Sequence, residues 1–122
     1  MTCRPQDFLT LAQKLSNSEE EIERRCAISR AYYAALHLAI EAKEKCPPIH
    51  ADTHRGGSHE ATIQRYAQHT SSTSAMKVGY VLRSMRNKRE SADYDLSGIC
   101  LASDVTLQIK DAQRIAEFLK AI

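Results

Sequence analysis

Between Glu19 and Lys45 the chain reads EEEIERRCAISRAYYAALHLAIEAKEK, with apolar side chains recurring every three or four residues. This spacing produces two neighbouring stripes along the segment. One stripe consists of Ile22, Cys26, Ser29, Tyr33, Leu36 and Ile40, and the other consists of Ile28, Tyr32, Ala35 and Ala39. Together they make a wide apolar face, which is typical of a helix that packs on two sides. Ser18 followed by acidic residues suits a helix start, and Pro47 cannot continue a helix. We therefore predict one long helix from about Glu19 to about Lys45.

Shorter segments with the same period lie on both sides of this helix. Their apolar positions are Phe8, Leu11, Ala12 and Leu15 after Pro5; Ala61, Ile63, Tyr66 and Ala67 after Ser58; Val78, Leu82, Met85 and Ala92; and Val105, Ile109, Ala112, Ile115, Ala116, Leu119 and Ile122. Ser58 and the pair Ser103-Asp104 are the expected caps of their helices. No useful segment alternates with a period of two, so we predict no sheet. The expected fold is all-α: a single domain over residues 1–122, built as an up-and-down bundle of four to five helices.

The composition narrows the class of protein. The 122 residues carry a formal charge of only +2, so any site for a polyanion has to be a local patch. No run approaches eighteen apolar residues and no secretory signal opens the chain, which predicts a cytoplasmic protein without a membrane partner. Four cysteines are widely spaced and lack zinc-ligand spacing: Cys3, Cys26, Cys46 and Cys100. We expect reduced thiols, no metal and no cofactor.

Arg89 is the most informative position, because it is in phase with Leu82 and Met85 on an apolar stripe. A charge that points into a core needs acceptors. Asp93 lies four residues later on the same face, and the hydroxyls of Ser29 and Tyr33 interrupt the apolar stripe of the long helix. Two interpretations remain open. The arginine forms a structural ion pair that fixes helix register, or its guanidinium binds a phosphate in a groove.

Basic residues and histidines offer further candidates. Arg83, Arg86, Lys88 and Arg89 place four positive charges within seven residues, which indicates either a solvated helix face or a contact surface for a phosphate backbone. The long loop 47–58 carries His50 and His54 and is followed by His59. These histidines have no recognisable metal-ligand spacing. For His59 we expect a place beside the Arg89 site.

Two segments resemble the signatures of HEPN domains. Ser29–His37 (SRAYYAALH) is similar to the family's Ser-Arg-x-Tyr-Tyr-Ala-Ala-x-His motif, and Leu82–Leu96 (LRSMRNKRESADYDL) is similar to its Leu-x-x-x-Arg-x-x-Arg-x-x-Ala-Asp-Tyr motif. His59 matches a histidine that the family often carries after its central loop. The resemblance implies a helical bundle that often forms homodimers and recurs in toxin–antitoxin, phage-defence and RNA-processing systems.

Many members of that family are metal-independent endoribonucleases. The resemblance implies an arginine that stabilises charge on the phosphate and a histidine, four to six residues later, that transfers protons. Here Arg86 is followed by no histidine up to the end of the chain, and Asp93-Tyr94 stands where the histidine would fall. An exposed aspartate is a poor general acid at neutral pH, since its ordinary pKa is about 3.9.

Three hypotheses follow, and the missing histidine favours the first. The chain is a non-catalytic or weakly catalytic HEPN module that binds RNA or a cognate toxin or antitoxin. Alternatively, it is an endoribonuclease in which Arg89, Asp93 and Tyr94 replace the usual pair. As a third hypothesis, it is an accessory subunit beside a nucleotidyltransferase. In the first hypothesis Arg83, Arg86, Lys88, Ser29, Tyr33 and His59 belong to the binding site.

Overall fold

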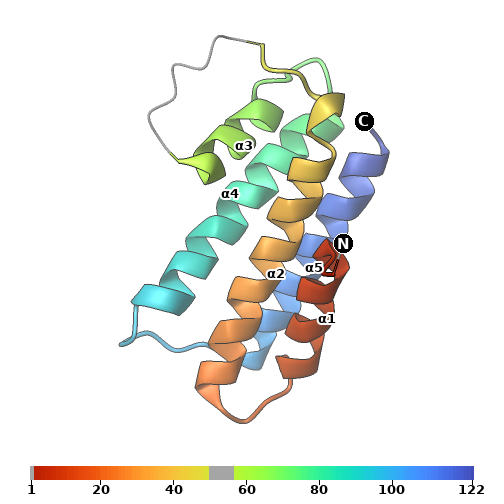
Figure 1. Ribbon diagram of the computed structural model, residues 1–122. Helices are drawn as coiled ribbons and strands as arrows, with labels where there is room; N and C mark the ends of the chain where they lie inside the picture. The colour runs from red at the N-terminus through yellow and green to blue at the C-terminus, as the bar shows by residue number, and fades with distance from the viewer. Residues whose placement is uncertain (1, 50–56) are drawn as a thin grey trace.

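The computed structural model describes residues 2–49 and 57–122, and its helices lie side by side in a bundle (Figure 1). Their bounds are α1 Pro5–Leu15, α2 Glu21–Glu41, α3 Ser58–Ala67, α4 Thr73–Tyr94 and α5 Ala102–Lys120, with a short 3-10 helix at Lys43–Lys45. No strand occurs in these two ranges. The prediction of an all-α bundle is confirmed. Residues 50–56 of the expected loop, with His50 and His54, lie outside the described residues.

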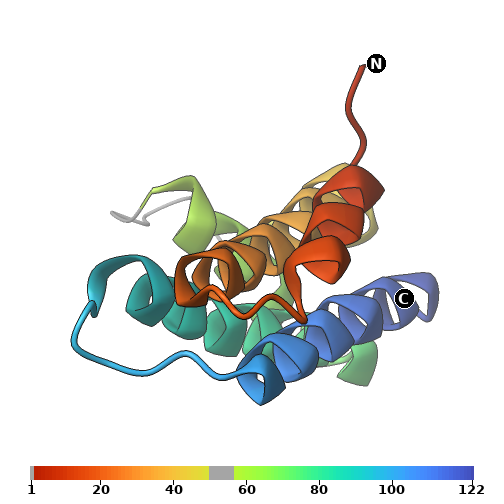
Figure 2. The same cartoon turned by 90° about the horizontal axis from the view of Figure 1, so that it is seen from below.

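The long helix α2 is central. It contacts α1, α4 and α5 along its length, and Figure 2 shows these three helices arranged around it, with α3 on the side of α4. One predicted stripe is confirmed, because Ile28, Tyr32, Ala35 and Ala39 are all buried. The other stripe is partly wrong, because Ile22 and Cys26 are exposed at the start of the helix. The wide apolar face is therefore largely covered within one chain.

Several predicted helix starts are shifted by one to three residues. Helix α2 begins at Glu21, and Ser18 instead accepts a hydrogen bond from the backbone N–H of Glu20. Helix α3 begins at Ser58 itself, after Gly57. Helix α5 begins at Ala102, and the carboxylate of Asp104 caps it by accepting the backbone N–H of Leu101 at 2.8 Å. The predicted caps Ser18 and Ser58 are therefore wrong, because α2 and α3 follow Glu20 and Gly57 without a side-chain cap. Asp104 does cap α5, since a carboxylate can cap from inside the first turn as well as before it.

The interior consists of two apolar clusters that α2, α4 and α5 share. The larger contains Tyr32, Leu36, Ile63, Tyr66, Leu82, Met85 and Ile115; the smaller contains Ala12, Ala27, Ile28, Ala31, Ala92, Val105 and Ile109. The fully buried Gln108 of α5 donates to the backbone oxygen of Met85 at 3.0 Å. Burial of this apolar surface is the main stabilising contribution to the fold.

Helix α3 lies close against α4, and this packing positions the residues considered next. A Cβ atom on the buried Gly79 would lie only 2.7 Å from the Cβ atom of Ala67, so the approach requires glycine at this point. Ile63 and Tyr66 anchor the same helix in the larger cluster. As a result, the first turn of α3, with His59 and Glu60, faces the middle of α4. In the described ranges no helix is long and apolar enough to cross a bilayer.

Candidate functional site

Arg89 lies where the sequence places it, on the face of α4 that packs against α2. Its side chain is 11% exposed, and its guanidinium carbon lies 5.9 Å from the ring centroids of both Tyr32 and Tyr33. It forms ion pairs with Asp93 at 3.6 Å and with Glu90 at 3.9 Å, both longer than a hydrogen bond. Within residues 2–49 and 57–122 its buried Nε has no hydrogen-bond partner. A nearly buried cation that lacks close acceptors is costly, and a bound anion would relieve that cost.

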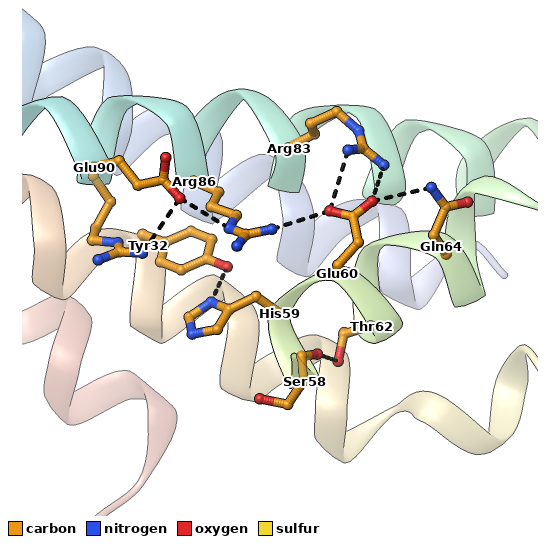
Figure 3. Close-up of polar contacts among 10 residues, drawn as sticks. Tyr32, Ser58, His59, Glu60, Thr62, Gln64, Arg83, Arg86 and Glu90 are labelled. Carbon is orange, nitrogen blue, oxygen red and sulfur yellow. Dashed lines mark hydrogen bonds and ion pairs between the residues drawn. The ribbon is translucent and has the colours of Figure 1, made fainter. Parts of the chain in front are cut away.

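Aromatic rings form one wall of this site. The hydroxyl of Tyr32 lies 2.7 Å from Nδ1 of His59, as Figure 3 shows, and their rings are nearly parallel with centroids 5.6 Å apart. Tyr33 meets the His59 ring edge-on at 5.8 Å. Arg30 lies over the outer side of Tyr33, with its guanidinium carbon 5.1 Å from the ring centroid. The wall holds His59 in a fixed orientation beside the arginines.

Electrostatics keep both members of the Tyr32–His59 pair uncharged. Burial raises the pKa of Tyr32 to about 12, against the opposing positive charges of Arg86 and Arg89. Burial lowers the pKa of His59, and the charges of Arg86 and Arg89 lower it further. At neutral pH the site therefore contains a phenol and a neutral imidazole next to two guanidinium groups.

A second cluster connects α3 to α4 through Glu60. The carboxylate accepts hydrogen bonds from Arg83 at 2.7 and 3.2 Å, from Arg86 at 3.0 Å and from Gln64 at 3.1 Å (Figure 3). Burial alone would raise the pKa of Glu60, but the hydrogen bonds from Arg83 and Gln64 and the charges of Arg83 and Arg86 lower it. Glu60 is therefore ionised and partly neutralises these two arginines.

Arg86 connects the two clusters. Beyond its bond to Glu60, its Nε forms an ion pair at 3.3 Å with a carboxylate oxygen of Glu90, and within the described ranges this Nε makes no hydrogen bond. At the other end of the site, the hydroxyl of Ser29 donates to Asp93 at 3.3 Å. Ser29 thus holds the carboxylate of Asp93, which is the nearest anion to Arg89.

The structure brings together most of the residues expected in the site and separates two of them. Ser29, Tyr33, His59, Arg83, Arg86, Arg89 and Asp93 lie along the junction of α2, α3 and α4. Lys88 points instead to α5, where its Nζ lies 3.6 Å from Asp111. Tyr94 is 76% exposed at the end of α4 and makes no hydrogen bond to the site. The four basic residues are therefore not one continuous patch.

Two important residues were not singled out from the sequence. The sequence places Tyr32 in the apolar stripe of the long helix. The one sign of a polar partner for Tyr32 is that His59 resembles a histidine of HEPN domains. Glu60 gave no signal, because its partners lie 23 and 26 residues away on another helix. Within the described ranges, no three His, Cys, Asp or Glu side chains come together as a metal-ligand set.

Chemically, the site offers guanidinium donors without close acceptors, a neutral imidazole and flat aromatic surfaces. This set suits an oxyanion that carries a planar or sugar group. Comparison of the chain with protein-family models, with curated proteins and with solved structures gave no match.

Proposed function

We propose that this chain is a HEPN-like module that binds the phosphate backbone of RNA, as a component of a toxin–antitoxin or defence pair. The observation that supports this proposal is Arg89, whose guanidinium lies beside two tyrosine rings with a buried Nε that has no hydrogen-bond partner in the described ranges. Asp93 forms an ion pair with Arg89 at 3.6 Å, which is longer than a hydrogen bond, so the guanidinium still has donors for another acceptor. A phosphate oxygen would supply the missing acceptor.

The test is a binding assay with labelled single-stranded RNA of about 16 nucleotides, followed by fluorescence anisotropy at increasing salt. Affinity should fall steeply with salt, because phosphate contacts release counterions. Arg89→Gln should weaken binding roughly tenfold or more, since it removes charged hydrogen bonds. Arg114→Gln is the matched control: this arginine is exposed on α5, where it pairs with Asp111 and lies over the Phe118 ring. Equal affinities of the two variants would refute the proposal.

A second candidate function, metal-independent RNA cleavage, is favoured by His59. The α4 helix lacks the histidine that the family resemblance implies, but α3 brings a neutral imidazole to the same arginines. When Nδ1–H donates to the Tyr32 hydroxyl oxygen, Nε2 is unprotonated and can accept the proton of a ribose 2′-hydroxyl. That oxygen attacks phosphorus, and the 5′-oxygen leaves with a proton from water. Cleavage with a chelator present that persists in Tyr94→Phe but disappears in His59→Asn would establish it. If the RNA stays intact, binding without cleavage is the function that remains.

A further inference from the structure

Glu60 occupies a position in which the donors of two arginines converge. One carboxylate oxygen accepts from Arg83 and Gln64, and the other accepts from Arg83 and Arg86. Arg83 contacts both oxygens, which is the fork-like geometry that guanidinium groups use for phosphates as well as carboxylates. The Glu60 side chain is only 16% exposed, so this internal anion is largely desolvated.

Contacts other than this carboxylate also hold α3 in place. Gly79 and Ala67 are in close contact near the other end of α3, and Ile63 and Tyr66 are fully buried in the core. The Glu60 side chain could therefore turn away from α4 without release of the helix. Arg83 and Arg86 would then present their donors to solvent beside Arg89.

We infer that Arg83 and Arg86 form a second phosphate subsite, which Glu60 occupies until a phosphate of an incoming strand displaces it. This inference rests on the proposed function. Arg83 and Arg89 are six residues apart on one helix, which is about 9 Å along its axis. One phosphate cannot span that distance, but two phosphates of one strand can. The ligand class is thus a polynucleotide, and a mononucleotide fills only the subsite at Arg89.

Glu60→Gln tests the inference, because it keeps the side-chain shape and removes the competing charge. RNA of about 16 nucleotides should bind at least about threefold more tightly, while the affinity for adenosine 5′-monophosphate, measured by competition, should stay the same. Asp111→Asn is the matched control. That carboxylate is also 16% exposed and also pairs across helices, with Lys88, but it lies away from the site. It should change RNA affinity by less than about twofold.

Arg83→Gln gives a second readout, which remains available if Glu60→Gln does not fold. It should weaken RNA binding and leave the affinity for the mononucleotide unchanged. A gain in Glu60→Gln no larger than in Asp111→Asn would overturn the inference, and so would an equal effect of Arg83→Gln on both ligands. A different result would refute the proposed function itself: the wild-type protein does not bind RNA, or the single variant Arg89→Gln binds RNA as tightly as the wild-type protein.

Discussion

Two arginines face the interior of this bundle, and their surroundings are opposite. Arg25 of α2 has a 7% exposed side chain and donates to three backbone oxygens, those of Ala92 and Asp95 at 2.9 Å and that of Gly98 at 2.7 Å. Arg89 of α4 is 11% exposed and has long ion pairs with Asp93 and Glu90. The first guanidinium uses its donors to close the end of α4 and the following turn. The second has a buried Nε without a hydrogen-bond partner in the described ranges.

The difference separates a structural arginine from a binding one. A buried cation whose donors are all used is part of the fold, and its removal exposes unpaired acceptors. A buried cation without close acceptors contributes little to stability, but it can bind an anion without first breaking strong internal bonds. Mutation of Arg25 should therefore mainly lower stability, and mutation of Arg89 should mainly weaken binding.

The largest effect on stability is expected for Arg25→Ala. Loss of three charged hydrogen bonds leaves the carbonyls at the end of α4 unpaired and should lower the free energy of unfolding by about 3 kcal/mol. Urea denaturation followed by circular dichroism measures this change. Arg114→Ala, on the exposed face of α5, should cost less than about 0.5 kcal/mol. A cost below about 1 kcal/mol for Arg25→Ala would show that Arg25 is not a structural arginine.

For Arg89→Gln we expect a smaller stability change, no more than about 1 kcal/mol. The variant loses contacts with two aromatic rings, but its carboxylate neighbours are accessible: Asp93 is 35% exposed and can be hydrated. The same denaturation experiment measures it, and RNA binding should weaken as described above. If Arg89→Gln unfolded the protein as strongly as Arg25→Ala, both arginines would be structural.

A smaller effect is expected in the titration of His59. Burial and the charges of Arg86 and Arg89 hold its pKa below the ordinary value of 6.5, so the folded state prefers the neutral imidazole. The contribution of His59 to stability is therefore fully present above 6.5 and is lost as the pH falls through the lower pKa of the folded state. Arg89→Gln should raise the pKa towards 6.5, which an NMR titration of the imidazole detects. An unchanged pKa would show that Arg89 does not act on His59.

The smallest effect of either arginine is expected on the oligomeric state, because Arg25 and Arg89 both contact residues of their own chain. The homodimer implied by the family resemblance stays a prediction. Light scattering should report about twice the chain mass of 13.7 kDa, and neither arginine variant should alter it. A monomer at micromolar concentration would contradict the homodimer but leave both arginine assignments intact.

The sequence predicted the helices well because the 3.6-residue period is a local property. Arg89 was found for the same reason: it shares a face with Leu82 and Met85, and a charge on that face stands out. The burial of side chains at the start of α2 is harder to predict, because Ile22 and Cys26 continue the apolar stripe but are exposed in the fold. Burial there depends on which neighbouring segments reach that turn, and periodicity does not contain this information.

Arg25 was not recognised, and its partners explain why. They are backbone oxygens, which every residue carries, so no side-chain pattern signals them. The Tyr32–His59 contact and the Glu60 cluster depend on how α3 docks on α4. That docking follows from a close approach at Gly79, which looks in the sequence like any other helical glycine.

The most direct test of the central claim is to follow the guanidinium resonances of Arg89 and Arg25 by NMR while single-stranded RNA is added. The account predicts that the Nε–Hε signal of Arg89 shifts progressively, because its unpaired donor acquires a phosphate acceptor. The signal of Arg25 should stay in place, because its donors are already engaged with carbonyls. RNA binding that leaves the Arg89 signal unchanged would contradict the account.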